Sequence, residues 1–300
     1  MKYYRRKTIS TLNTESYDIL NDHLVVNFND ENYDLGITDY ETIFRDSKSS
    51  GKTIDEYVKK IISDTNIPTW RWNNKLGPID DSLLLPLFPQ EVWAAGVTYS
   101  DSMRERQAES DTPDVYAKVY SSERPEIFFK GTAERMQGPN EYVGIRKDSG
   151  WDVPESELAV VIIDGEIAGY TIGNDMSSRS IEGENPLYLP QAKVYNKSCS
   201  VGPCIVSVET IGDPQKLSVN LEIIRNNKIV FKGESSTSKM KRNVKELTEW
   251  LQKSNDLPGT GLLLTGTGII PEQDFTLKPE DLINISIEKI GTLTNKVALV

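Results

Sequence analysis

Three acidic residues on either side of a predicted β-hairpin are the most informative feature of this 300-residue chain. Glu155 and Glu157 stand two residues apart at the start of an apolar run, so a β-strand directs both carboxylates to one face. Asp164-Gly165 then supplies the favoured dipeptide of a two-residue turn, and a second apolar run leads to Asp175. We therefore predict that the hairpin returns Asp175 to a position beside Glu155.

The register of this hairpin decides where Asp175 points. A regular two-residue loop places Glu155 opposite Asn174, one residue before Asp175. Strict alternation would then turn Asp175 to the opposite face of the sheet. We predict that the strand ends or bulges around Gly173-Asn174 and turns the Asp175 carboxylate back toward the two glutamates.

Three carboxylates in one small volume repel each other unless they are protonated or bound to a cation. A donor set made only of oxygen suits Mg²⁺, with Mn²⁺ or Ca²⁺ as alternatives, and does not suit zinc. The other interpretation is a solvated pair of glutamates beside a hairpin, which is common in acidic proteins. Spacing alone leaves both interpretations open.

The composition excludes several classes of function. The chain has 34 Lys and Arg against 45 Asp and Glu, a net charge of −11, so it lacks the basic footprint of a nucleic-acid-binding protein. No apolar run approaches the roughly 20 residues that a membrane span requires. The polar N-terminal sequence does not resemble a signal peptide. We expect a cytoplasmic globular protein that binds neither nucleic acid nor membrane.

Histidine and cysteine are scarce. Ser-His-Asp and Cys-His machinery needs an imidazole, but the one histidine, His23, stands in a predicted turn that enters a strand, where a structural or surface role is expected. Cys199 and Cys204 are too few for a disulfide scaffold and suit a reducing compartment; we expect both to be buried small residues. The chemistry is therefore expected to depend on carboxylates, lysine, tyrosine or a metal.

The predicted elements divide the chain in two. Residues 1–88 are expected to form a small N-terminal α/β domain with an amphipathic helix over 54–62, which Thr53 and Glu56 begin as a capping box. Two prolines in the apolar segment 83–89 indicate a packed linker. Residues 89–300 are strand-rich, and we predict strands over 217–223, 229–231 and 283–287 and a helix over 238–253.

Several segments in a fixed order resemble the fumarylacetoacetate hydrolase superfamily. They are residues 154–161, 169–179, 191–193, 202–203, 265–269 and 290–295. The resemblance implies a β-rich α+β fold, the mixed β-roll of that superfamily, behind the small N-terminal domain. It also implies a divalent metal, usually Mg²⁺, held by Glu155, Glu157 and Asp175. Ser180 stands where the superfamily has an aspartate.

Within that superfamily, residues 91–99, 124–130 and 184–193 are most similar to the 2-keto-3-deoxy-D-arabinonate dehydratases. This resemblance implies that Glu126 and Lys193 are catalytic. It also implies that six residues lie near the substrate: Thr98, Tyr99, Arg104, Arg106, Lys130 and Thr267. We favour Glu126 as the base and Lys193 as the acid or electrostatic partner, although the sequence does not fix this order.

The absence of histidine from the predicted lid separates two reactions of the superfamily. Its hydrolases use a histidine–glutamate pair to activate water, and residues 99–117 contain no histidine. Elimination of water needs no activated nucleophile. The expected function is therefore that of a magnesium-dependent hydro-lyase, which converts a 2-keto-3-deoxy sugar acid, most simply 2-keto-3-deoxy-D-arabinonate, to 2,5-dioxopentanoate through a metal-stabilised enolate in pentose catabolism.

Two other functions stay open at this point. One is an acylpyruvate hydrolase or oxaloacetate decarboxylase on the same metal platform. The other is a non-catalytic protein that binds sugar acids. In each case the expected partner is a small 2-keto acid, and the resemblance further implies a homo-oligomer.

Overall fold

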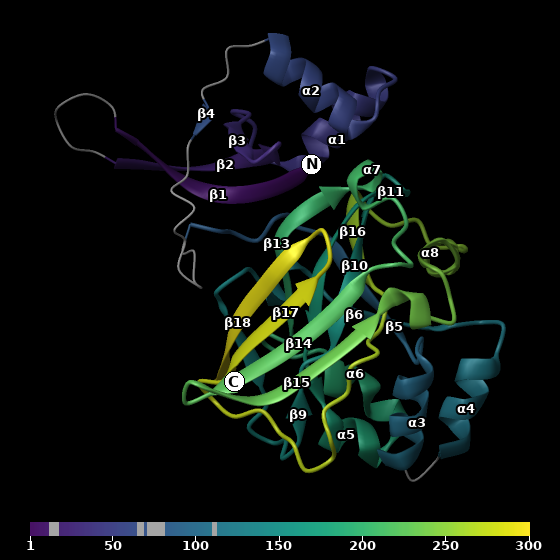
Figure 1. Ribbon diagram of the computed structural model, residues 1–300. Coiled ribbons are helices and arrows are strands. Elements are labelled where there is room, and N and C mark those ends of the chain that lie inside the picture. Colours follow the sequence, from purple (N-terminus) through teal and green to yellow (C-terminus); the bar gives the residue numbers. More distant parts are fainter. Residues whose placement is uncertain (12–17, 65–68, 71–81, 110–112) are drawn as a thin grey trace.

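Two large β-sheets and the helices around them form the molecule (Figure 1). The computed structural model describes residues 1–11, 18–64, 69–70, 82–109 and 113–300. Within this part, an 11-stranded sheet has the order β4-β3-β2-β1-β13-β11-β10-β16-β5-β6, with β7 paired to β13, and a five-stranded sheet has the order β15-β14-β17-β18-β8. The predicted strand-rich α+β fold is confirmed.

The N-terminal strands extend the larger sheet. They are β1 (Lys2–Thr11), β2 (Asp18–Phe28), β3 (Glu31–Asp34) and β4 (Thr69–Trp70). Antiparallel pairing of Lys2 with Val206 joins β1 to β13 (Cys199–Ser207), so one hydrogen-bonded sheet runs through both parts of the chain. A division into domains at residue 88 stays a prediction.

Two helices, α1 (Tyr40–Ser49) and α2 (Ile54–Asp64), cover the N-terminal strands. The predicted capping box of α2 is confirmed. The Glu56 N–H donates to the Thr53 hydroxyl at 3.2 Å, and the Thr53 N–H donates to the Glu56 carboxylate at 3.1 Å. His23, on β2, lies 2.5 Å from the Asp34 carboxylate, which agrees with the structural role expected for it.

The centre of the larger sheet is buried on both faces. Its strands are β10 (Ser156–Ile163), β11 (Glu166–Asp175), β13 and β16 (Thr260–Leu264). Beyond β16 the sheet continues with β5 (Glu91–Gly96) and ends with β6 (Glu126–Gly131), which is less buried. Leu158, Val160 and Ile162 pack into one hydrophobic cluster, and the alternating Ala159 and Val161 pack into another. The uninterrupted apolar run of β10 is the pattern of a strand with no solvent-exposed face.

The five-stranded sheet covers one face of this centre. It contains β14 (Ser218–Arg225), β15 (Lys228–Ser236), β17 (Leu282–Ile287), β18 (Gly291–Leu299) and β8 (Tyr142–Ile145). The predicted strands are confirmed. Asn226 and Asn227 both have positive φ, which is the geometry of a two-residue hairpin turn.

The predicted helix over 238–253 is too long. The observed helix, α8, spans Val244–Leu251, because the Asn243 side chain accepts the Glu246 N–H at 2.8 Å and so begins the helix six residues later than predicted. Ahead of it, Thr237–Lys239 forms a short 3₁₀ turn. The cysteine prediction is confirmed, since Cys199 and Cys204 are both free and buried.

The remaining short elements gather mainly at one end of the large sheet (Figure 1). They are α3 (Ser100–Glu109), α4 (Pro113–Ser121), α5 (Arg179–Glu184), α6 (Leu189–Lys193), β9 (Asp152–Val153) and β12 (Ser177–Ser178). Two further elements, α7 (Val208–Ile211) and β7 (Met136–Gln137), lie elsewhere. Short 3₁₀ turns span Ala133–Arg135 and Pro186–Tyr188. None of the described helices has the length and apolar character needed to cross a membrane.

Candidate active site

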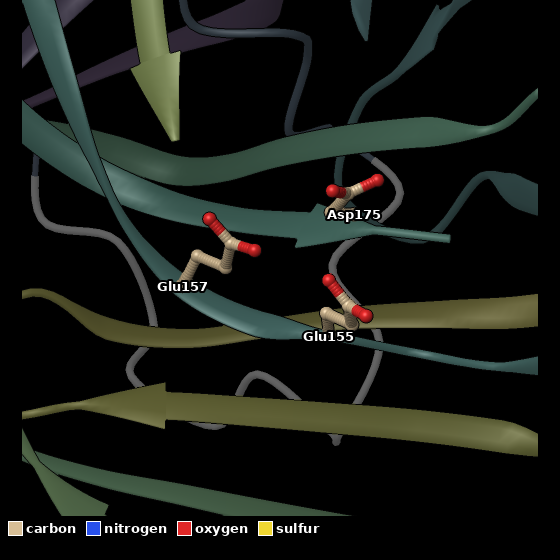
Figure 2. Close-up of side chains that lie close together, drawn as sticks. All are labelled: Glu155, Glu157 and Asp175. Atoms are coloured by element: carbon tan, nitrogen blue, oxygen red, sulfur yellow. The ribbon is translucent and has the colours of Figure 1, made fainter. Parts of the chain in front are cut away.

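The three predicted carboxylates meet at the end of the β10–β11 hairpin (Figure 2). Glu155, Glu157 and Asp175 each offer an oxygen, and these oxygens all lie within 4.8 Å of one another. All three side chains are buried. Buried oxygen donors at this spacing suit a hard divalent cation, and the alternative of a solvated glutamate pair is excluded by the burial.

The bulge that brings Asp175 to this face is not at the predicted position. Instead of a bulge around Gly173-Asn174, an extra residue, Ala168, interrupts the pairing of β10 with β11. The Tyr40 hydroxyl of α1 donates to the Ala168 carbonyl at 2.9 Å. The bulge shifts the register by one residue, so Glu155 lies opposite Asp175 and both side chains leave the same face.

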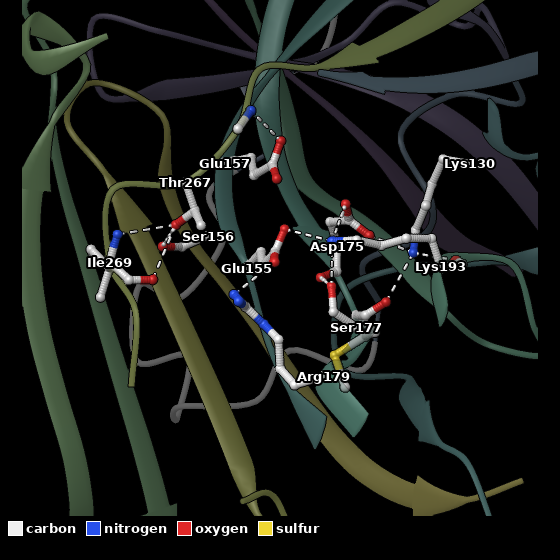
Figure 3. Close-up of polar contacts among 12 residues, drawn as sticks. Lys130, Glu155, Ser156, Glu157, Asp175, Ser177, Arg179, Lys193, Thr267 and Ile269 are labelled. Carbon is white, nitrogen blue, oxygen red and sulfur yellow. Dashed lines mark hydrogen bonds and ion pairs between the residues drawn. The ribbon is translucent and has the colours of Figure 1, made fainter. Parts of the chain in front are cut away.

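Three buried cations surround the carboxylates (Figure 3). Glu155 receives the Arg179 guanidinium at 2.9 Å on Oε1 and the Lys193 ammonium at 2.8 Å on Oε2. Asp175 pairs with Lys130 at 2.5 Å through Oδ1 and with Lys193 at 3.2 Å through Oδ2. These cations compensate the charge of Glu155 and Asp175 in a region that excludes water.

The negative charge of Glu157 is compensated less well than the charges of Glu155 and Asp175. Its Oε2 accepts the Gly266 N–H at 2.6 Å, and the structure gives it no direct ion pair among the described residues. Burial, and then the charges of Asp175 and Glu155, raise the pKa of Glu157 well above its usual range. A divalent cation would remove this penalty, so the residues present fit a metal of the Mg²⁺ type.

A tight turn after β16 supplies that N–H donor. Gly266 has a φ of +90°, and a β-carbon there would lie 2.0 Å from the Thr98 hydroxyl oxygen. Thr98 in turn donates to the Thr265 carbonyl at 2.7 Å. Glycine is therefore required at this position by both backbone conformation and space. Thr98 stabilises the turn that holds Glu157.

A cavity beside the carboxylates collects the predicted catalytic residues. Glu126, Lys193 and Thr267 all line it, together with Glu155 and Asp175. Glu126 is the first residue of β6 and pairs with Gly96 of β5, where a β-carbon would lie only 2.1 Å from the Glu126 carboxylate. Because Gly96 has no side chain, the Glu126 carboxylate can occupy this position.

Four other predicted substrate-binding residues do not line the cavity: Thr98, Tyr99, Arg104 and Lys130. Tyr99 and Lys130 are buried, and burial, with a smaller effect of Glu157, raises the pKa of Tyr99. The Arg104 side chain is 73% exposed on α3 and lies 3.7 Å from Asp101. The side chain of Arg106 lies outside the described residues. Their contact with substrate stays a prediction.

Sequence reasoning missed several residues of the site. Arg179 and Glu182, one turn apart on α5, are both buried, and Glu182 lines the cavity with Ser102 and Tyr116 from the α3–α4 region. A basic residue four positions after Asp175 was an available signal for Arg179. No local pattern marks Ser102 or Tyr116, because helices distant in sequence bring them to the cavity.

Ser180, which replaces the aspartate of the superfamily, has a local role. Its hydroxyl oxygen accepts the N–H groups of Gly150 and Trp151 at 3.1 and 2.9 Å. It fixes the turn before β9 and does not contact the carboxylates in any hydrogen bond of the described residues.

A strand-rich roll that gathers three buried carboxylates, and places Glu126 and Lys193 in a cavity lined by two of them, defines a divalent-metal-dependent enzyme. Residues 91–298 match the Fumarylacetoacetate (FAA) hydrolase C-terminal family. The chain belongs to this family.

Two relatives and one solved structure are similar to the chain over most of its length. The chain is 49% identical over 222 residues to a probable 2-keto-3-deoxyxylonate dehydratase of Haloferax volcanii, covering 74% of this chain and 77% of that protein. It is 40% identical over 271 residues to 2-dehydro-3-deoxy-D-arabinonate dehydratase of Saccharolobus solfataricus, covering 87% and 91%. A structure of 2-keto-3-deoxy-D-arabinonate dehydratase complexed with magnesium and 2,5-dioxopentanoate has a TM-score of 0.80 at 32% identity, covering 100% and 99% of the two chains.

Proposed function

We propose that the protein is a magnesium-dependent hydro-lyase that removes water from a 2-keto-3-deoxy sugar acid, most simply 2-keto-3-deoxy-D-arabinonate, and releases 2,5-dioxopentanoate. The observation that carries the proposal is one cavity lined by Glu155, Asp175, Glu126 and Lys193. Two dehydratase relatives at 49% and 40% identity support the reaction, and the magnesium complex of the similar structure supports the metal and product.

Glu155, Glu157 and Asp175 would hold the cation. When bound, a divalent cation supplies positive charge that polarises the C2 carbonyl of a keto acid and makes its C3 proton more acidic. The chain's own residues then move protons. Glu126, in the cavity wall, takes the C3 proton, and Lys193, which already faces the site as a hydrogen-bond donor, protonates the C4 hydroxyl as it leaves. Elimination leaves a C3–C4 double bond beside the C5 hydroxyl. Transfer of a proton from C5 to C3 moves the double bond to C4–C5, and this enol becomes the aldehyde of 2,5-dioxopentanoate.

Elimination is favoured over the hydrolytic and decarboxylating alternatives. A hydrolase must activate water with a base, and residues 99–117 provide no histidine for that task. Elimination of water from the 2-keto-3-deoxy acid needs a base for C3 and an acid for the C4 hydroxyl, which the cavity supplies as Glu126 and Lys193. A purely binding protein would not need this pair beside the carboxylates.

A direct assay tests the function. Purified protein with Mg²⁺ is expected to convert 2-keto-3-deoxy-D-arabinonate to 2,5-dioxopentanoate, followed by NMR, and chelation by EDTA is expected to abolish turnover. Oxaloacetate and an acylpyruvate serve as competing substrates. Turnover of either of these, with none of the sugar acid, would contradict the proposal, and binding of the sugar acid without product would favour the binding protein.

We also propose a cellular location and an oligomeric state for the enzyme. A small-molecule substrate and two buried free thiols agree with a cytoplasmic enzyme of pentose catabolism. We expect a homo-oligomer, since Leu187, 84% exposed, and the neighbouring Tyr188 leave apolar surface uncovered on the single chain. Light scattering on the purified protein measures the oligomeric state, and a monomer at micromolar concentration would contradict this expectation.

A further inference from the structure

Two lysines with the same charge and the same burial flank the Asp175 carboxylate (Figure 3). Lys130 is 0% exposed and Lys193 is 1% exposed. One approaches Asp175 through Oδ1 and the other through Oδ2. Their remaining partners differ, and this difference separates their roles.

Lys130 is anchored mainly to the main chain. Its ammonium donates to the Met176 carbonyl at 3.0 Å and to the Lys193 carbonyl at 2.5 Å, besides its ion pair with Asp175. Neither carbonyl belongs to the proposed ligand set of Glu155, Glu157 and Asp175, so we expect both bonds to persist when a cation binds. Lys130 therefore ties β11 to the backbone of α6.

Lys193 is anchored to the proposed metal ligands themselves. Its ammonium donates to Glu155 Oε2 at 2.8 Å, to Asp175 Oδ2 at 3.2 Å and to the Ser177 hydroxyl at 2.6 Å. The other oxygens of these two carboxylates face Arg179 and Lys130. The two oxygens that Lys193 binds are thus the ones directed toward a common point.

A Mg²⁺ ion binds carboxylate oxygens at about 2.1 Å. Bound to Glu155 Oε2 and Asp175 Oδ2 together, it would lie within a few ångströms of the Lys193 ammonium. Two positive charges at that distance repel strongly in a buried site. The long, flexible side chain of lysine can move away, whereas the Lys193 backbone stays fixed by Lys130.

We propose that the Lys193 ammonium occupies the shared oxygens of Glu155 and Asp175 until a divalent cation displaces it, and that Lys130 is a positioning residue that keeps the Lys193 backbone and Asp175 in place during the exchange. This inference rests on the proposed metal site. Metal loading would then free the Lys193 amine for the substrate, so the general acid becomes available only in the loaded enzyme.

Titration calorimetry with Mg²⁺ and Mn²⁺, in the absence of substrate, tests the exchange without reading activity. Lys193→Met removes the competitor, so its metal affinity is expected to rise at least about tenfold, the change that one lost charge-assisted hydrogen bond corresponds to. Lys130→Met removes an equal buried charge but no contact with Glu155 Oε2 or Asp175 Oδ2, and its affinity is expected to stay equal to that of the wild type or to fall.

The calorimetry results distinguish a failure of the proposed metal site from a failure of the proposed lysine exchange. A wild type that binds neither metal overturns the metal site and this inference together. A wild type that binds Mg²⁺, with equal gains in affinity for Lys193→Met and Lys130→Met, overturns the exchange alone, because the gain is then general electrostatics. Sugar-acid turnover by the wild type would leave the proposed function standing in that case.

A crystal structure of the wild type soaked in MgCl₂ gives a second test, which does not depend on the folding of either variant. The Lys193 ammonium is expected to lie beyond hydrogen-bond distance of Glu155 Oε2 and Asp175 Oδ2, while Lys130 keeps its bonds to the Met176 and Lys193 carbonyls. A bound ion with both Lys193 contacts intact would overturn the exchange.

Discussion

Glu155 and Asp175 face each other as a hydrogen-bonded pair. The Glu155 N–H donates to the Asp175 carbonyl at 3.2 Å, and the Asp175 N–H donates to the Glu155 carbonyl at 3.0 Å. In such an antiparallel pair both side chains leave the same face of the sheet. The hairpin backbone therefore fixes the distance between two proposed metal ligands before any cation binds.

Glu157→Gln is expected to change metal affinity and stability in opposite directions. Because the raised pKa of Glu157 means that its buried charge destabilises the metal-free fold near neutral pH, the variant should melt at a higher temperature without metal. Its Mg²⁺ affinity should fall by about 100-fold, as expected for the loss of a charged ligand. Thermal unfolding with and without MgCl₂ measures both effects. A lower melting temperature of the metal-free variant would show that the carboxylate is compensated by groups other than a metal.

Arg179→Met is expected to destabilise the protein by about 3 kcal/mol, because it leaves Glu155 with one fewer charged partner in a buried site. Arg45→Met provides the control, since its pair with Asp164 is about half exposed, at 45% and 52%, and should contribute under about 1 kcal/mol. Urea unfolding of both variants measures the difference. Equal losses would mean that the burial of the Arg179 pair adds nothing.

Glu126→Gln is expected to lower turnover by about 10²–10⁴-fold, the usual contribution of a general base. The residue does not belong to the carboxylate trio, so Mg²⁺ binding by calorimetry should stay as in the wild type. Near-native turnover would remove Glu126 from the proton transfers. A loss of metal affinity would instead assign it to the metal site.

Gly96→Ala tests the position of the Glu126 carboxylate without changing the chemistry of that residue. The added methyl group would lie 2.1 Å from the Glu126 carboxylate and must push it aside. Gly96 does not have the positive φ that strains other residues, so the backbone should tolerate alanine. We expect turnover to fall at least about tenfold with unchanged metal affinity, as a small displacement of a catalytic group produces. Full activity would show that Glu126 works from another rotamer.

Asp152 predicts a pH dependence of stability. Burial raises the pKa of Asp152 to about 6, so the folded state favours its protonated form. The contribution of Asp152 to the free energy of unfolding is therefore most favourable below about pH 4, the pKa of the carboxyl in the unfolded chain. It is lost as the pH rises through about 6. Asp152→Asn should therefore stabilise the protein by up to about 2 kcal/mol at pH 7.5 and by nothing at pH 4. Urea unfolding at both pH values measures this, and an equal effect at both would show that the carboxyl does not titrate there.

Much of the local structure could be predicted because short-range patterns determine it. Asp164-Gly165 and Asn226-Asn227 begin hairpins through their own backbone preferences, and Thr53 with Glu56 begins a helix through hydrogen bonds within one turn. The start of α8 was predicted six residues too early, because the capping role of Asn243 was not recognised.

The tertiary structure decided how these pieces meet. The Tyr40 hydroxyl reaches the bulge at Ala168 from 128 residues away, and that bulge sets the register that aims Asp175. The Gly266 N–H reaches Glu157 across 109 residues. Alternating polarity specifies which residues face inward, but a shift of one residue reverses every side chain, and only packing against distant elements selects the register. The sequence alone therefore determined the carboxylates and their hairpin, and the fold determined that they form one site.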